Sequence, residues 1–134
     1  MELRLLTVRQ PYASCILRRC KPIENRSRGT PYRGLVAILS ATKIFTNDRA
    51  QEAARRCFGD TRYVENPHDF KRGGIIGVAE LYDVVTEHGS WWFSGPFGYL
   101  LRNPQPIPFI PCTGHQQALV GPSHAIKTRV LQNL

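Results

Sequence analysis

The sequence predicts an α+β fold in which about six strands form a small barrel or a curled mixed sheet, with helices at its periphery. The apolar runs are short and are interrupted by Pro and Gly, of which the 134 residues contain 10 and 11. Helical periodicity occurs early, in the middle and at the end of the chain. The short, interrupted strands favour a small barrel or a curled mixed sheet over a doubly wound fold. This length fits one domain, and we assign residues 1–134 to it.

The first third of the chain predicts two strands around a short helix and an extended segment. Leu3–Val8 is apolar and partly alternating, which predicts the first strand. Pro11 then fits the first turn of a helix that runs to about Arg19. Ile23–Arg26 predicts a short extended segment, and the continuous apolar run Leu35–Leu39 predicts a fully buried strand.

The remaining elements follow from capping residues and apolar runs. Asn47 or Asp48 can cap a second helix that stops at Gly59, and residues 60–72 predict a surface loop. Ser123 can cap a terminal helix over 122–134. The other strands are predicted at Ile75–Val85, Phe97–Leu101 and Ile107–Cys112, with a turn at Asn103-Pro104 between the last two and a Trp-rich loop over 87–96.

The charge of the chain favours a polyanionic partner. Lys and Arg number 18 against 10 acidic residues, which gives a formal net charge of +8. Such a surplus attracts nucleic acid, although charge alone is also compatible with a basic protein that is merely soluble. No signal peptide is evident, and the apolar run Leu35–Leu39 is far shorter than the roughly 20 residues of a membrane helix. We therefore expect a cytoplasmic protein without a membrane span.

The four cysteines are Cys15, Cys20, Cys57 and Cys112, and none belongs to a C-x-x-C pair. In a cytosolic protein this spacing predicts buried free thiols and not a disulfide framework. Cys112 and His115 could form half of a zinc site, but a second half with ligand spacing is missing. We therefore expect no metal.

Three segments in the first third resemble the ASCH domain family, a branch of the PUA-like superfamily. They are residues 6–13, 21–27 and 32–38, and the match extends over most of residues 3–121. In the family signature G-x-K-x-x-E-x-R, Lys21, Glu24 and Arg26 occupy the K, E and R positions. The signature glycine falls on Arg19, which suggests that this helix end need not use a left-handed glycine.

The resemblance implies a PUA-like β-barrel with helices on its outside, a cleft beside the barrel and an RNA-related role. The chemistry of the three signature residues agrees in part. Side chains two apart in an extended segment share a face, so Glu24 and Arg26 should point the same way, with Lys21 in reach. A carboxylate flanked by two cations stays ionised and leaves donors for an anion. The alternative is a purely structural salt bridge of Glu24 with Arg26 or Lys21.

We predict that nucleic acid contacts basic, amide and aromatic side chains around this cleft. Arginines widen its positive rim, and tyrosines can stack on bases. The tyrosines can equally belong to the core, and the tryptophans can pack under their loop. The candidate nucleic-acid-binding residues are Arg9, Gln10, Tyr12, Lys21, Arg26, Tyr32, Arg33, Trp91 and Trp92.

The leading functional prediction is an RNA- or nucleotide-binding domain, with single-stranded RNA as the favoured ligand and no cofactor. A first alternative is a small hydrolase acting on RNA phosphodiesters or on modified, acylated nucleosides, with a divalent metal if it is a nuclease. Lys21 would then be base or nucleophile, Glu24 would transfer a proton to the leaving group, and Arg26 would hold the developing anion. A second alternative is a module that binds a small molecule or a protein partner. The oligomeric state stays open.

Overall fold

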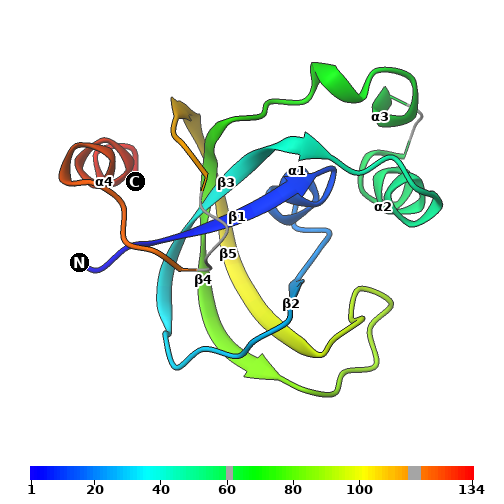
Figure 1. Ribbon diagram of the computed structural model, residues 1–134, viewed down its shortest axis with the longest axis horizontal. Helices are drawn as coiled ribbons and strands as arrows, with labels where there is room; N and C mark the ends of the chain where they lie inside the picture. The colour runs from blue at the N-terminus through cyan, green and yellow to red at the C-terminus, as the bar shows by residue number, and fades with distance from the viewer. Residues whose placement is uncertain (60–61, 115–118) are drawn as a thin grey trace.

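A computed structural model describes residues 1–59, 62–114 and 119–134, and its centre is a curled sheet of five strands (Figure 1). The strands are β1 (Arg4–Gln10), β2 (Ile23–Arg26), β3 (Gly34–Ile44), β4 (Gly74–Val85) and β5 (Phe97–Pro111). Their order across the sheet is β1-β3-β4-β5-β2. β1 pairs with β3 in parallel, and the other neighbours are antiparallel.

The sixth predicted strand does not exist separately, because the two predicted strands after residue 96 are one continuous strand, β5. The predicted turn at Asn103-Pro104 is instead a bulge. Val78 pairs with Gln105 and Glu80 with Arg102, so two residues of β5 lie opposite one of β4. Asn103 takes a left-handed conformation with φ 54°, which asparagine tolerates better than most residues.

The sheet curls, but it does not close into the predicted barrel. The two ends of the strand order are β1 and β2, and no backbone ladder joins them in the described ranges. β2 has only four residues, and its other edge is fully paired with β5. The side chain of Arg26 in β2 bridges the gap by donating a hydrogen bond to the carbonyl oxygen of Thr7 in β1. The two edge strands therefore face each other across side chains and not across backbone hydrogen bonds.

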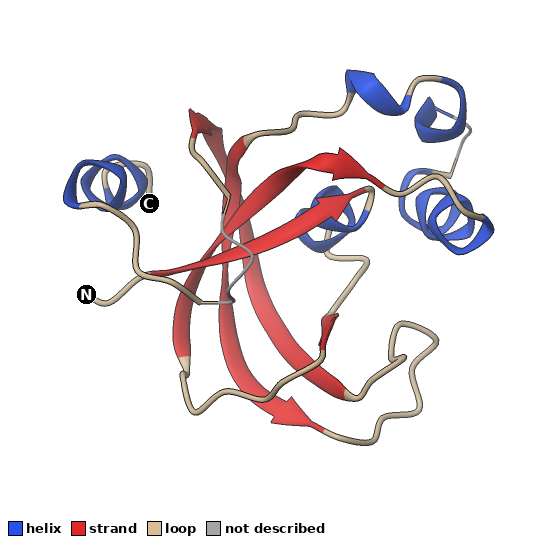
Figure 2. Ribbon diagram, viewed as in Figure 1, coloured by secondary structure: helices blue, strands red, loops and turns tan. Residues whose placement is uncertain are grey.

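In the described ranges, four α-helices surround the sheet: α1 (Tyr12–Leu17), α2 (Asp48–Phe58), α3 (Arg62–Glu65) and α4 (His124–Leu131). Figure 2 shows α1, α2 and α3 on one side of the sheet and α4 on the other. The segment predicted as a surface loop over 60–72 contains α3 and a short 3₁₀ helix, Pro67–Asp69. No helix in the described ranges is long and apolar enough to cross a membrane.

Strand alternation divides the core into two faces. Leu6, Val8 and Ile38 belong to the cluster that includes Ala13 and Ile16 of α1. Leu5 and Leu39, one position removed from those residues, belong to the cluster beneath Val130 of α4. The terminal helix predicted from Ser123 thus covers the outer face, and Ser123 caps it by accepting a hydrogen bond from the backbone N–H of Ile126.

The helix boundaries follow the predicted caps with one informative difference. Asn47 caps α2 by accepting from Ala50, and Gly59 ends it in a left-handed conformation. α1 stops at Leu17, two residues before the predicted end. Arg19 then adopts φ 63°, so the left-handed conformation is present at the signature glycine position although the residue is arginine.

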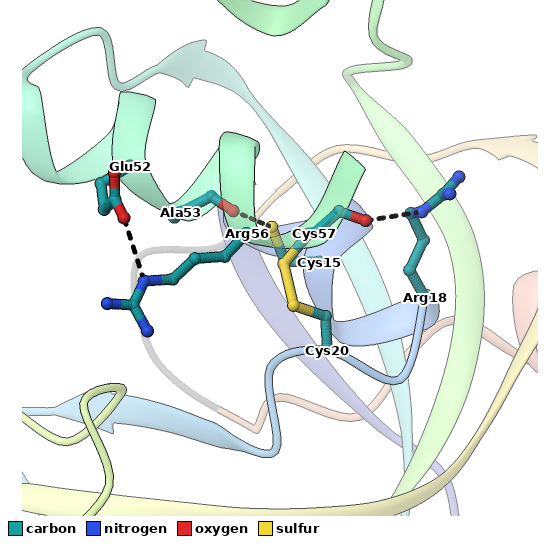
Figure 3. Close-up of a disulfide and its surroundings, with 7 residues drawn as sticks. All are labelled: Cys15, Arg18, Cys20, Glu52, Ala53, Arg56 and Cys57. Atoms are coloured by element: carbon teal, nitrogen blue, oxygen red, sulfur yellow. Dashed lines mark hydrogen bonds and ion pairs between the residues drawn. A yellow bond between two sulfur atoms is a disulfide. The ribbon is translucent and has the colours of Figure 1, made fainter. Parts of the chain in front are cut away.

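The expectation of free thiols is wrong for two of the four cysteines. Cys20 and Cys57 form a disulfide with a Cα–Cα distance of 5.5 Å (Figure 3). The bond joins the segment after α1 to the last turn of α2, 37 residues along the chain. This pairing depends on the packing of α1 against α2, and the spacing of the cysteines along the chain does not reveal that packing. Cys15 and Cys112 are free.

Candidate functional site

A cleft of about 380 Å³ opens between the edge strands β1 and β2, and we call it the seam cleft. Each strand supplies three consecutive residues, and the rest come from α1, the α1–β2 segment, the start of α2 and two loops. The lining residues are Thr7, Val8, Arg9, Tyr12, Lys21, Glu24, Asn25, Arg26, Phe45, Arg49, Trp92 and Ser94. The cleft therefore occupies the gap that a closed barrel would fill with a backbone ladder.

The three signature residues meet in this cleft. Lys21 Nζ lies 3.1 Å from Glu24 Oε1, and Arg26 Nη2 lies 3.4 Å from Glu24 Oε2. Their side chains are 3%, 13% and 20% exposed, respectively. The predicted common direction of Glu24 and Arg26 is confirmed by these ion pairs. Partly buried ion pairs add little net stability, because desolvation offsets much of the attraction. The cluster lines an open cleft, so a ligand could reach it.

The ammonium of Lys21 is held from several directions. It donates to the carbonyl oxygen of Ile23 as well as to Glu24. The ring centroids of Tyr12 and Trp92 lie 5.5 and 5.8 Å from Nζ, within the range of a cation–π contact. Lys21 is thus a fixed positive charge at the floor of the cleft, between two aromatic walls.

Arg26 has a donor that the protein does not use. Its Nη2 serves Glu24 and the carbonyl oxygen of Thr7. Its Nε is buried and has no acceptor among the described residues. A buried N–H without a partner costs about 1–3 kcal/mol, and a bound water, ion or ligand that accepts from it would remove this cost.

The sequence analysis missed Asn25, which fixes the Trp-rich loop onto β2. Its Nδ2 donates to the carbonyl oxygen of Trp92 at 2.8 Å. Its Oδ1 accepts from the backbone N–H groups of Ser94 at 2.9 Å and Gly95 at 3.2 Å. Its place between Glu24 and Arg26 in the signature segment is the one signal that could have identified it.

Trp91 and Trp92 have different environments. Trp92 is 8% exposed and lines the seam cleft. Trp91 lies outside the cleft lining and packs under guanidinium groups of α2, with Arg49 and Arg56 at 4.2 and 4.0 Å from its ring centroid. Its carbonyl oxygen also accepts from Arg49 at 2.6 Å.

Phe45 and Arg49 complete the rim opposite β2. Tyr12 packs edge-to-face on Phe45. The guanidinium carbon of Arg9 also lies over the Phe45 ring, 4.9 Å from its centroid. Burial raises the pKa of the Tyr12 phenol above its usual value. Phe45 and Arg49 lie 19 and 23 residues beyond Arg26, the last residue of the signature, so no local pattern points to them.

Three predicted contacts lie elsewhere. Gln10 is fully buried, and its side-chain amide donates to the carbonyl oxygen of Lys71 and accepts from the N–H of Ser14. The hydroxyl of Tyr32 donates to the carbonyl oxygen of Leu35 at 2.7 Å. Arg33 Nη2 lies 3.7 Å from Asp83 Oδ1, and both side chains are exposed. Of the nine candidate nucleic-acid-binding residues, the cleft brings together Arg9, Tyr12, Lys21, Arg26 and Trp92.

The described ranges contain no group of three or more His, Cys, Asp or Glu that could hold a metal ion. Glu24 is the one acidic side chain among the described residues that line the cleft. His115, the second residue of the possible half zinc site, lies outside the described residues.

No protein-family model matches the chain. Activating signal cointegrator 1 of Homo sapiens is 31% identical over 110 residues, and the same protein of Mus musculus is 29% identical over 110 residues. These alignments cover 75% of this chain but only 19% of each relative, so the chain spans about a fifth of their length.

The fold is similar to that of solved structures. The crystal structure of ASCH from Zymomonas mobilis covers 98% of this chain, and 94% of that chain is matched, with a TM-score of 0.62 and 16% identity. Two mutants of the Zymomonas protein superpose with TM-scores of 0.62 and 0.60. At this identity the likeness concerns the fold.

Proposed function

We propose that this chain, which belongs to the ASCH domain family, binds RNA or a nucleotide in the seam cleft. The observation that carries the proposal is the Lys21–Glu24–Arg26 cluster between the aromatic walls of Tyr12 and Trp92. A phosphate needs fixed cations and free N–H donors, and a base needs an aromatic face on which to stack. The cleft has both within one small volume.

The arrangement favours an unpaired strand. Base stacking on Tyr12 or Trp92 requires a base that has left a duplex, and such stacking contributes about 1–3 kcal/mol per base. The cleft of about 380 Å³ lies at the small end of the range typical of ligand pockets, which suits one nucleotide and not a helix. The net charge of +8 would add long-range attraction to any polyanion.

Binding of a labelled single-stranded RNA pool, measured by fluorescence anisotropy at several salt concentrations, tests this proposal. We expect affinity to fall steeply with salt, because each phosphate contact releases counterions. Arg26→Ala should weaken binding roughly tenfold or more, since a hydrogen bond to a charged group contributes about 1.5–3 kcal/mol.

Two further variants keep the test independent of folding. Arg49→Ala changes an exposed residue on the rim of the cleft and should also weaken binding. Arg129→Ala removes the same charge from an exposed position on α4 that lines no described cavity, and it should bind RNA as the wild type does. An absence of RNA binding at low salt, or equal losses in all three variants, would contradict the proposal.

A second candidate is a hydrolase that acts on an RNA phosphodiester or on an acylated nucleoside. It is favoured by one observation, the 3.1 Å contact between Lys21 and Glu24, whose side chains are both largely buried in the seam cleft. At this distance a proton can pass between the two side chains. Lys21→Ala and Glu24→Gln, assayed on both substrates with and without a divalent metal, test this candidate. Turnover that both variants lose while RNA binding persists would support it; no turnover in the wild type would exclude it for these substrates.

A further inference from the structure

A second and larger cavity lies next to the seam cleft, and we call it the outer groove. Its volume is about 1040 Å³, against about 380 Å³ for the seam cleft. The two cavities share Thr7, Arg9 and Arg26 as lining residues. Arg26 and Thr7, which hydrogen-bond each other, line both cavities, so the cleft and the groove adjoin at this contact.

The outer groove is cationic. Arg9, Arg26 and Lys43 line it, and no Asp or Glu does so among the described residues. Arg9 and Lys43 are both exposed. Thr7, two residues before Arg9 in β1, and Thr42, next to Lys43 in β3, also line the groove and add hydroxyl donors. The chemistry of this surface matches a phosphodiester backbone, which presents repeated negative charge and acceptor oxygens.

A bulge in the sheet brings Lys43 to the groove. Val8 pairs with Ser40 and Gln10 with Ile44, so Arg9 lies opposite the three residues Ala41–Lys43 of β3. A bulge re-aims side chains at the edge of a sheet, and it is found often beside functional sites. Here it places a lysine of β3 and an arginine of β1 on neighbouring positions at the carboxyl ends of two parallel strands.

We infer that the outer groove binds the sugar–phosphate backbone of an oligoribonucleotide of which one nucleotide occupies the seam cleft. This inference rests on the proposed function and narrows its ligand from RNA or a nucleotide to a strand of several nucleotides. Arg26 lines both cavities, and its buried Nε lacks an acceptor among the described residues. A phosphate that contacts Arg26 would supply that acceptor after a small movement of the side chain.

The test is to measure the affinity of ribonucleotide ligands that increase in length from a mononucleotide to an octanucleotide. We expect affinity to rise severalfold with length. Lys43→Ala should remove part of that rise and lower the salt slope by about 0.7 for each lost phosphate contact, while the affinity for the mononucleotide stays unchanged. Lys71→Ala, which removes the same charge from an exposed side chain on a separate cavity, should change neither affinity.

The outcomes separate the two proposals. If the mononucleotide binds as tightly as the octanucleotide, or if Lys43→Ala weakens both equally, the groove is not a backbone site, although the seam cleft still binds nucleotides. If no ligand of any length binds at low salt, the proposed function fails and the groove inference fails with it. If an acidic peptide binds and is lost in Lys43→Ala, while oligonucleotides do not bind, the groove is a protein-binding surface.

Discussion

Arg26 lies where β1 and β2 approach each other, and its donors act on both strands. Its Nη2 reaches the carbonyl oxygen of Thr7 in β1 and the carboxylate of Glu24 in β2. A guanidinium can do this because its planar fork presents five N–H donors in fixed directions. Arg26 therefore links the two edge strands and places a positive charge in the seam cleft.

Arg19 gives a prediction about stability. It adopts φ 63°, where a residue with a Cβ is about 1–2 kcal/mol less favourable than glycine. The hydrogen bond that its side chain makes among the described residues, from Nη2 to the carbonyl oxygen of Pro104, is long at 3.5 Å and exposed. Arg19→Gly should therefore raise the free energy of unfolding by about 1 kcal/mol, less the added chain entropy of the unfolded state. Urea denaturation measures the change.

Arg19→Ala is the matched control for this change. It removes the same side chain but keeps the Cβ, so it should not stabilise the protein. A gain of equal size in both variants would show that the arginine side chain and not the backbone conformation is unfavourable.

The buried phenol of Tyr63 in α3 should make the free energy of unfolding depend on pH at high pH. Its hydroxyl donates to the carbonyl oxygen of Phe45 and lies 2.9 Å from that of Gln10. Burial raises the pKa of the phenol from 10.0 to about 12. The unfolded phenol ionises above pH 10 while the folded one stays neutral, so the stabilisation due to Tyr63 is fully present below pH 10 and is lost as the pH rises towards 12.

Tyr63→Phe tests this dependence through urea denaturation at a series of pH values. The wild type should exceed the variant by about 1 kcal/mol or more near neutral pH, since a buried hydrogen bond is lost. That difference should shrink between pH 10 and pH 12. A difference that stays constant across this window would show that the phenol does not titrate as described.

At the scale of the elements, α1 and α2 are joined by packing and by a covalent bond. Cys15 of α1 is fully buried, and its thiol donates to the carbonyl oxygen of Ala53 in α2. Arg18 donates to the carbonyl oxygen of Cys57 at 3.2 Å (Figure 3). The Cys20–Cys57 disulfide closes this contact next to Lys21. It therefore holds α2, whose Arg49 lines the seam cleft, against the segment that carries the cleft lysine.

The disulfide predicts the number of reactive thiols. Denatured, oxidised protein should show two thiols without a reductant, from Cys15 and Cys112, and four after reduction. In the native state Cys15 should resist alkylation, because burial raises its pKa to about 12. Cys57→Ser should lower the free energy of unfolding by up to about 4 kcal/mol, the value expected for a closed loop of this length. Four thiols in the oxidised, denatured protein would contradict the bond.

Local signals predicted the helices better than the sheet. Asn47, Gly59 and Ser123 act as the predicted caps, because a cap depends on a few neighbouring residues. The last two predicted strands are one strand, because Asn103-Pro104 has the composition of a turn but forms a bulge. A bulge lies opposite a neighbouring strand that continues past it, whereas a turn ends the strand. The sequence of one strand does not show which neighbour it pairs with.

For the molecule as a whole, the sequence predicted the charged cluster of the site better than the distant residues that surround it. The signature spacing brought Lys21, Glu24 and Arg26 together, because three residues on a short segment can meet locally. Phe45, Arg49 and the outer groove arise from the curl of the sheet, which brings distant strands to one place. Whether the sheet closes into a barrel also depends on this long-range geometry. The sequence does not contain that information, and a barrel was therefore predicted where the sheet is open.

Backbone amide chemical-shift mapping with a single-stranded oligoribonucleotide tests the central claim most directly. The method reports contacts across the described ranges without a substitution that could disturb the fold. We predict that the largest shifts occur in the segments 7–9, 24–26 and 92–94, which contribute Thr7–Arg9, Glu24–Arg26, Trp92 and Ser94 to the lining of the seam cleft, with little change in α4 beyond Ile126. Shifts confined to the surface away from these three segments, or no shifts at saturating RNA, would contradict the assignment of the cleft as the binding site.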